Sequence, residues 1–149
     1  MKIINRKFHR DYESLESVEA GIVLTGSEVK SIRDGHLQLE GAFVKMLGSE
    51  VYLINANITP YAFANEKNYD PRRTRKLLLH RKEILRLQIK LNQGGRLTLA
   101  PVSCYNKGPH IKLEVALSRP RKELEKRKLE KGRDVELQQK REMKEYMKS

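Results

Sequence analysis

"HIKLEVALS", residues 110–118, alternates apolar and polar side chains. The apolar ones share one face and are Ile111, Leu113, Val115 and Leu117. Lys112 and Glu114 lie on the opposite face, which is typical of a β-strand with one buried side. The preceding residues 106–109, Asn-Lys-Gly-Pro, predict a hairpin loop. This stretch therefore predicts the second strand of an antiparallel hairpin.

Similar segments occur elsewhere in the chain. They are short, rich in β-branched residues and bounded by turn residues: AGIVLTG (20–26), GAFVKML (41–47), VYLINANI (51–58) and RLTLAPVSCY (96–105). Small all-β domains remove exposed sheet edges by closing the sheet on itself. The sequence therefore predicts a mainly β fold, an antiparallel oligonucleotide-binding (OB-like) barrel with two or three short helices.

Two helices are predicted between these strands. GSE at 26–28 begins a short helix, with Ser27 as its cap and Gly35 as its stop. The second covers residues 80–93, where the apolar residues fit either a strand or a helical face. We favour a helix here because Gly94-Gly95 follows, as glycines commonly follow helices.

The chain is strongly basic, with 31 Lys and Arg against 19 Asp and Glu and a net charge of +12. Such an excess favours binding to phosphate-rich or anionic surfaces. No apolar run approaches the roughly 18 to 20 residues that span a bilayer, and no apolar block follows the basic N-terminal residues. We expect a cytoplasmic protein with no membrane partner. The single cysteine, Cys104, allows neither an internal disulfide nor a cysteine-based zinc finger.

The composition changes abruptly near Ser118. Beyond it charged residues dominate, and the apolar stripe on a helical wheel is limited to Leu124, Val135 and Tyr146. This stripe buries too little area to offset the entropy of ordering the segment. We therefore predict a barrel over residues 1–118 and a basic tail over residues 119–149 that is disordered in solution and helical on a partner. A merely solubilising tail is the alternative.

The sequence carries no recognisable catalytic motif. Its four histidines lack metal-site spacing, and no glycine-rich phosphate loop or nucleophile elbow occurs. Asp34, His36 and Glu40 form the nearest catalytic grouping, but such a group is more typical of a turn after a helix. We expect a binding protein without catalytic residues, metal or cofactor. RNA is favoured over DNA because no pattern of a DNA-recognition helix appears.

Four blocks resemble, in order and spacing, the bacterial SsrA-binding protein (small protein B) family. They are EAGIVLTGSEVKSIRDG (19–35), INANITPY (54–61), DPRRTRKLLLH (70–80) and RLTLAPVSCYNKG (96–108). The resemblance runs from Asn5 to about Arg127 and implies an oligonucleotide-binding barrel, in agreement with the predicted strands. It also implies a non-enzyme that binds the tRNA-like domain of transfer-messenger RNA (tmRNA, SsrA RNA) and brings it to stalled ribosomes for trans-translation.

The implied partners are tmRNA, the decoding region of the small ribosomal subunit and, through tmRNA, elongation factor Tu and alanyl-tRNA synthetase. We expect a monomer. Two alternatives remain open: a structural or assembly protein bound to ribosomal RNA, and a nuclease that uses the Asp34, His36 and Glu40 group.

The resemblance also implies a set of RNA-binding residues. These are Asn5, Tyr12, Glu19, Lys30, Arg33, Arg72, Arg73, Arg75, Lys76, Leu78 and Lys112. Arg72, Arg73, Arg75 and Lys76 would form a basic rim that meets phosphates, because a guanidinium can hold two phosphate oxygens. Ion pairs with Asp70 and Glu83 are the structural alternative for two of these arginines.

Some of these positions have ordinary structural alternatives. Glu19 could accept from base amino groups or form a strand-edge salt bridge. Tyr12 could face an RNA loop or cap the core. Leu78 could be a core residue, and Lys112 could be an ordinary solvated lysine.

The tail departs from the family pattern. The residues expected to dock on the ribosome are Arg121, Lys122, Leu124, Glu125, Lys126, Arg127 and Lys128. Leu124 stands where the family has an aromatic ring or His, and Pro120 stands where it has Gly. The sequence therefore predicts docking by charge and leaves ring stacking on ribosomal bases in doubt.

Overall fold

The computed structural model describes residues 1–64 and 67–148, without the side chains of residues 135, 136 and 145–148. Its strands are β1 (Lys2–Ile4), β2 (Tyr12–Ile22), β3 (Leu37–Gln38), β4 (Phe43–Leu47), β5 (Glu50–Ile54), β6 (Asn57–Ile58), β7 (Arg75–Leu78), β8 (Thr98–Lys107) and β9 (His110–Pro120). Its helices are α1 (Phe8–Asp11), α2 (Gly26–Arg33), α3 (Arg81–Asn92) and α4 (Glu123–Lys148). The fold is mainly antiparallel β with several helices, as the sequence predicts.

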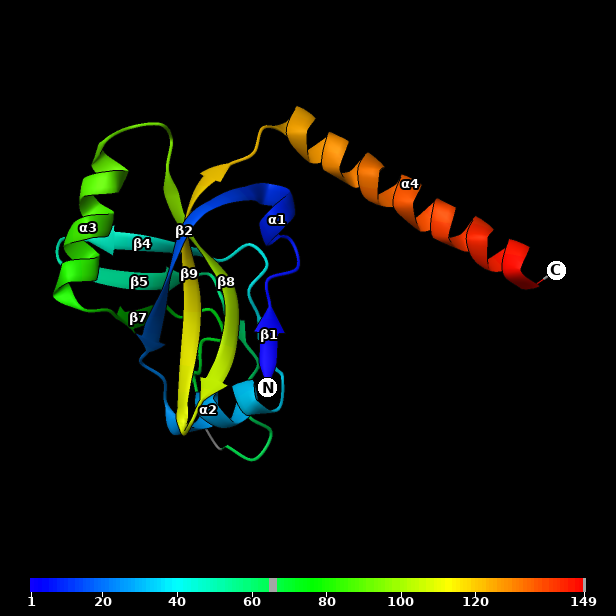
Figure 1. The fold of residues 1–149 in the computed structure, drawn as a ribbon. Coiled ribbons are helices and arrows are strands. Elements are labelled where there is room, and N and C mark those ends of the chain that lie inside the picture. Colours follow the sequence, from blue (N-terminus) through cyan, green and yellow to red (C-terminus); the bar gives the residue numbers. More distant parts are fainter. Residues whose placement is uncertain (65–66, 149) are drawn as a thin grey trace.

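The main sheet closes into a ring. Its strand order is β1-β8-β4-β5-β7-β2-β9, and β9 pairs back onto β8. All of these pairings are antiparallel. β3 and β6 form a separate two-stranded sheet. Figure 1 shows β2, β9 and β8 side by side, with α3 and α4 on opposite sides of the body.

The inside of the ring holds the core. Nearly every strand contributes to it, and its members include Val18, Ala20, Val44, Val51, Leu53, Leu77, Leu99, Leu113 and Val115. α2 adds Ile32, which is fully buried, and α3 adds Leu87. Cys104 is also buried, and burial raises the pKa of its thiol to about 12. Cys104 is thus a small buried residue of the apolar core.

The structure contains the predicted hairpin, formed by β8 and β9, and reproduces the alternation of apolar and polar residues in β9. Leu113 and Val115 point inward and are fully buried, while Lys112 and Glu114 are only partly buried. The loop is tighter than predicted, because β8 runs to Lys107 and β9 begins at His110. Gly108 occupies the turn with φ 60, a conformation that favours glycine.

Two predicted strands have different limits. β2 begins at Tyr12 rather than Ala20 and ends at Ile22. Its C-terminal limit is set by Thr25, which caps α2. The predicted strand over 51–58 is split into β5 and β6 at Asn55, whose φ of 66 breaks the extended chain.

Both predicted helices occur. Thr25, not Ser27, caps α2, because the Thr25 hydroxyl accepts from the Glu28 amide at 3.2 Å while the Glu28 carboxylate accepts from the Thr25 amide at 3.0 Å. Gly35 follows α2 with φ 84, as expected of a helix stop. α3 covers the predicted second helix, and Gly94 and Gly95 follow it with φ 90 and 86.

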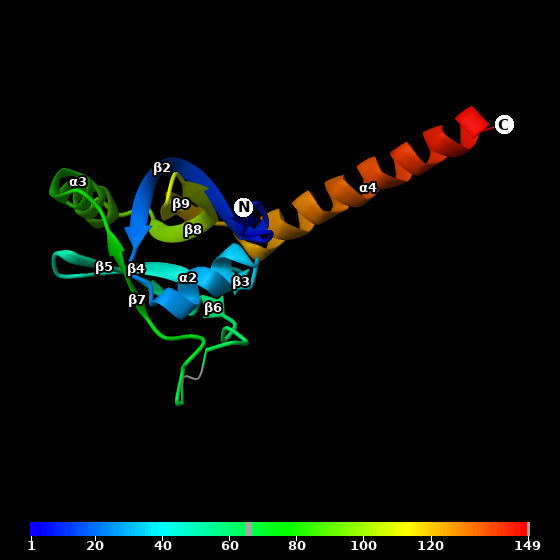
Figure 2. The same ribbon diagram turned by 90° about the horizontal axis from the view of Figure 1, so that it is seen from below.

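α4 leaves the body after β9 and projects away from it (Figures 1 and 2). β9 continues to Pro120, opposite Tyr12, so the ordered sheet extends past the boundary predicted at Ser118. All described side chains from Arg127 to Lys144 are exposed. Within the described residues, no helix is long and apolar enough to cross a membrane.

Candidate nucleic-acid interface

The outer face of β7, β2 and β9 brings several predicted residues together. Gly21 on β2 lies opposite Leu78 of β7 on one side and Lys112 of β9 on the other. Glu19 shares the outer face with Gly21, since Val18 and Ala20 point into the core. Leu78 is 54% exposed, so the alternative that it is a core residue is wrong, and its side chain is available on the surface. Its neighbour Leu77 takes that role, because successive residues of a strand face opposite sides.

The missing side chain of Gly21 makes room for Leu78 on this face. A Cβ at position 21 would lie 3.3 Å from the Leu78 Cβ, closer than most real Cβ contacts, so the Leu78 side chain occupies the space that a side chain at position 21 would need. Two hollows of about 340 and 250 Å³ lie beside Gly21, and Gly21, Leu78 and Lys112 line both. Glu19 and His80 line the first hollow. A partner could therefore approach the backbone here between an apolar side chain and a cation.

Glu19 is held in place by residues of β8. The Tyr105 hydroxyl donates to one carboxylate oxygen, and Lys107 lies 3.0 Å from the other. The bond from Tyr105, followed by that from Lys107, lowers the pKa of Glu19, whereas burial and Glu19 together raise the pKa of Tyr105 to about 12. The strand-edge salt bridge considered for Glu19 is thus present. A carboxylate oxygen can accept more than one bond, so this salt bridge leaves acceptor capacity toward a base.

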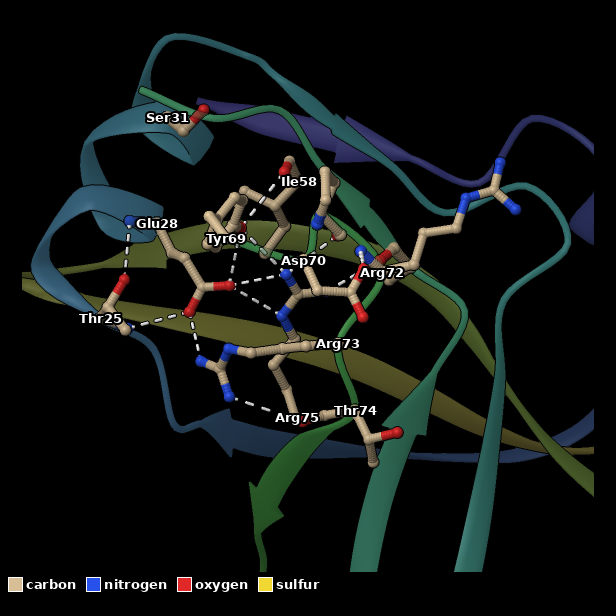
Figure 3. Close-up of polar contacts among 12 residues, drawn as sticks. Thr25, Glu28, Ser31, Ile58, Tyr69, Asp70, Arg72, Arg73, Thr74 and Arg75 are labelled. Atoms are coloured by element: carbon tan, nitrogen blue, oxygen red, sulfur yellow. Dashed lines mark hydrogen bonds and ion pairs between the residues drawn. The ribbon is translucent and has the colours of Figure 1, made fainter. Parts of the chain in front are cut away.

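A buried ionic network lies under the basic segment (Figure 3). At its centre is Glu28 of α2, which is 1% exposed. Arg75 donates to Glu28 Oε2 through Nε at 2.9 Å and through a terminal nitrogen at 2.6 Å. Arg73 pairs with Glu28 Oε1, and the Tyr69 hydroxyl donates to Oε2 at 3.0 Å. This network attaches the segment that leads into β7 to helix α2.

The position of Arg75 contradicts the prediction that it belongs to an exposed basic rim. Its side chain is fully buried and also donates to the carbonyls of Ala56 and Pro71, at 2.8 and 3.0 Å. A guanidinium without solvent requires such partners, because an unpaired buried charge is very costly. Arg75 therefore does not belong to an exposed basic rim. Its acidic partner is Glu28, and not Asp70 or Glu83, the partners of the structural alternative, because helix α2 brings the Glu28 carboxylate inward.

The network controls the ionisation of Glu28. Burial opposes the charged form, but the bonds from Thr25, Arg73 and Arg75 outweigh it and lower the pKa to about 2. Arg73 is partly buried by the same pairing. Arg72 is exposed, with its side chain donating to Asn55 at 3.3 Å. Lys76 is exposed in a surface pair with Glu50 at 3.3 Å. Arg72 and Lys76 are thus the fully exposed members of the predicted rim.

α2 carries two further residues that are predicted to bind RNA, Lys30 and Arg33. Arg33 donates to the Pro109 carbonyl in the β8–β9 turn at 3.2 Å. Lys30 lies one turn earlier, with its ammonium 5.6 Å from the centre of the Tyr61 ring. Val29 and Pro109 both line the smaller hollow beside Gly21. The basic side of α2 therefore adjoins the outer face of β7, β2 and β9.

Asn5 and Tyr12 are not part of this surface. Asn5 is 4% exposed, and its amide donates to the Pro101 carbonyl at 2.9 Å and accepts from the Lys7 amide at 3.3 Å. This corrects the prediction that the amide faces RNA, because the group serves to hold the N-terminal segment on β8. Tyr12 stacks on Phe8 at 5.7 Å, and burial raises its pKa. The alternative that Tyr12 caps the core is therefore confirmed.

The tail residues divide into two groups. Arg121 is attached to the body, donating to the carbonyls of His9 and Tyr12 at 3.0 and 3.3 Å. Lys126 lies 3.6 Å from Asp11 and is partly buried. The remaining predicted docking residues are exposed and are Lys122, Leu124, Glu125, Arg127 and Lys128. The side chains of Val135 and Tyr146 lie outside the described residues.

The residues of the nuclease alternative have structural contacts. Asp34 ends α2, and Glu40 accepts from the Arg6 amide at 3.3 Å. The backbone of His36 bonds to Ser31 and Thr59, at 3.0 and 3.2 Å. Among residues 1–64 and 67–148, no group of three or more His, Cys, Asp or Glu side chains could hold a metal ion.

Sequence reasoning missed the residues that organise the surface. Gly21 lies inside the quoted EAG block, but only the strand register shows that it lies between Leu78 and Lys112. Tyr105 and Lys107 lie far from Glu19 in sequence, and no pattern links them. The sequence did contain a pattern that indicates a structural role for Glu28, because Thr25 and Glu28 have the spacing of a capping box.

Comparisons with known proteins agree on one family. The family model described as SmpB protein matches residues 2–145. The SsrA-binding protein of Caldicellulosiruptor saccharolyticus is 46% identical over 143 residues, covering 96% of this chain and 90% of the relative. That of Deinococcus radiodurans is 48% identical over 131 residues, covering 88% and 91%. A solved structure described as "tmRNA-SmpB: a journey to the center of the bacterial ribosome" matches with a TM-score of 0.66 at 45% identity, covering 82% of this chain and 85% of that one.

Proposed function

The chain belongs to the SmpB protein family, and on that basis we propose that it binds the tRNA-like domain of tmRNA and delivers this RNA to stalled ribosomes for trans-translation and ribosome rescue. It acts as an RNA-binding protein and not as an enzyme. The relatives are SsrA-binding proteins, and the similar structure concerns tmRNA, SmpB and the ribosome. Elongation factor Tu and alanyl-tRNA synthetase are proposed as partners through tmRNA, and the protein as a cytoplasmic monomer.

The outer face around Gly21 carries the proposal. It presents Lys112 and Lys76 to phosphates, Leu78 to an apolar part of the RNA, and the ionised Glu19 to base amino groups. The hollows beside Gly21 leave room for the RNA to approach the strand. This arrangement suits a folded RNA that is recognised by its shape and backbone.

The closed ring provides a rigid support for this face. We propose that it is a barrel of the oligonucleotide-binding kind, supported by the β8–β9 pairing that closes the ring and by the core inside it. The Glu28 network supports the proposal further, because it holds the start of β7, and with it Lys76 and Leu78, in a fixed register against β2.

For the tail, we propose disorder in solution and a helix on the ribosome. Among the described side chains of α4, the ion pairs with the body come from its first turns, Lys126 with Asp11 and Glu130 with Arg10. Such surface ion pairs contribute little, typically 0 to 1 kcal/mol each. A lone, exposed helix with Gly132 in its middle lacks the packing that stabilises most protein helices. Phosphates of the ribosome would attract its exposed basic residues and offset the ordering cost.

The direct test is capture of RNA from a bacterial lysate, followed by sequencing. One dominant tRNA-like species supports the proposal, whereas ribosomal RNA as the dominant species supports the structural or assembly alternative. In parallel, Lys112→Glu should weaken binding of a transcript of the tRNA-like domain. Lys140→Glu makes the same charge change on the exposed tail and serves as the matched control. Equal loss of affinity in both variants would remove Lys112 from a specific contact.

A further inference from the structure

A surface turn beside α2 exposes two aromatic rings that the predicted interface does not include. Phe63 is 87% exposed, the highest value among the large apolar side chains that the structure describes. Its ring lies edge-on to Tyr61, with centroids 5.5 Å apart at an angle of 66°. Burial of an aromatic ring is normally favourable, so an almost fully exposed Phe on a defined turn is an available binding surface.

The turn is held in position at both ends. The Ala64 amide donates to the Tyr61 carbonyl at 3.0 Å, which closes the turn around Phe63. Before it, the Ser31 hydroxyl of α2 donates to the Thr59 carbonyl. After it, Tyr69 bonds to the buried Glu28 carboxylate. The rings therefore stand next to α2 before any ligand arrives, which lowers the entropy cost of binding.

Positive charge adjoins the rings. Lys30 lies 5.6 Å from the centre of the Tyr61 ring, and Arg33 follows one turn later on the same helix. Single-stranded nucleic acids are bound by this combination, in which bases stack on aromatic side chains while cations hold the backbone. Protein hot spots, in contrast, lie in well-packed and fully desolvated pockets. A pair of rings with Lys30 beside it fits an RNA base better.

We propose that Phe63, with Tyr61 and Lys30, forms a stacking platform for an unpaired base of the bound RNA. The ring of Phe63 takes the base, and Lys30 takes an adjacent phosphate. The inference rests on the proposed function and extends the interface from the face around Gly21 along α2 to the turn that carries Tyr61 and Phe63. Arg33 links the two parts through its contact with Pro109.

The absence of tryptophan from the chain allows a direct test. Phe63→Trp creates a single fluorophore at the platform, and a stacked base quenches it. The probe is a transcript of the tRNA-like domain of tmRNA. Saturable quenching that follows the binding curve, measured independently by filter binding, supports the platform. Full binding without any change in Trp emission overturns it and leaves the proposed function intact. Failure of the wild-type protein to bind overturns both.

Affinity gives the second measurement. Phe63→Leu keeps an apolar side chain but removes the ring, and it should weaken RNA binding by about 5- to 150-fold, the range for one lost base stack. Phe43→Leu is the matched control, because Phe43 is a 40% exposed ring on β4 that is not part of the proposed platform. Equal affinities of both variants for the RNA would overturn the platform. If Phe63→Leu then lowered only peptide tagging on ribosomes, Phe63 would instead contact a ribosomal component.

Discussion

Glu28→Gln tests whether the buried network supports the fold. The substitution keeps the size of the side chain but removes the charge that Arg73 and Arg75 share. It also turns an amide donor toward a guanidinium, leaving a buried cation without its full complement of acceptors. We expect the variant to fold with much lower stability, because both arginines lose their ionic partner.

The expected loss in the free energy of unfolding can be calculated in two ways. A fall in the Glu28 pKa from 4.5 to about 2 corresponds to about 3 kcal/mol, at 1.36 kcal/mol per pKa unit. Removing one partner of a buried ion pair typically costs about 3 to 5 kcal/mol. The agreement predicts a loss of about 3 to 4 kcal/mol in the free energy of unfolding at pH 7. This is a large part of the roughly 5 to 15 kcal/mol that stabilises an ordinary domain.

The pH dependence gives a sharper test. The folded-state pKa of Glu28 is lowered, so its stabilisation is fully present above pH 4.5 and is lost as the pH falls toward 2. Urea unfolding of both proteins, followed by circular dichroism between pH 7 and pH 2, measures this. The difference between wild type and Glu28→Gln should be largest above about pH 5 and should shrink below it.

Glu13→Gln is the control for this experiment. Glu13 is about half exposed and pairs with Arg119 at 3.6 Å on the surface. Its substitution should change the stability by less than about 1 kcal/mol, as is usual for exposed ion pairs. If Glu28→Gln were as stable as Glu13→Gln, or kept a constant difference from wild type down to pH 2, the network would not stabilise the fold as argued.

Three further predictions concern binding. Replacing Arg72 and Lys76 by Ala should flatten the plot of log affinity against log salt by about 0.7 to 0.9 per lost phosphate contact, and an unchanged slope in the folded double variant would exclude them from the interface. A chain ending at Lys122 should keep the folded sheet and bind the isolated tRNA-like domain but lose tagging activity; loss of circular dichroism typical of the sheet would contradict the two-part organisation. Lys126→Glu with Arg127→Glu should abolish peptide tagging on ribosomes stalled at a truncated message without changing RNA affinity, and normal tagging would show that this cluster does not dock the tail.

The local elements followed from local patterns. The alternation in HIKLEVALS predicted β9 and the orientation of Lys112, because a strand has a fixed period of two. The glycines after residues 26–33 and 81–92 marked helix ends, because their positive φ suits glycine. The predicted strand over 51–58 was less accurate, because nothing local showed that Asn55 adopts a left-handed conformation.

The basic segment shows the limit of such reasoning. The family resemblance placed Arg72, Arg73, Arg75 and Lys76 on one rim, because four cations within five residues cannot be told apart by their charge. In the structure Arg75 is fully buried and Lys76 is exposed, since β7 turns alternate residues to opposite sides. The partner that permits the burial, Glu28, comes from a helix far away in the sequence.

The sequence by itself determined the mainly β class, the basic charge, the glycine stops after α2 and α3 and, through its ordered motif blocks, the family. These properties depend on composition and on neighbours within a few residues. Only the tertiary structure decided which cations of the basic segment are exposed, and that Gly21 lies between Leu78 and Lys112 on the outer face. The reason is physical. Burial, strand register and ion pairing depend on contacts between residues that lie far apart in the sequence, and no local sequence pattern predicts which of these residues come into contact.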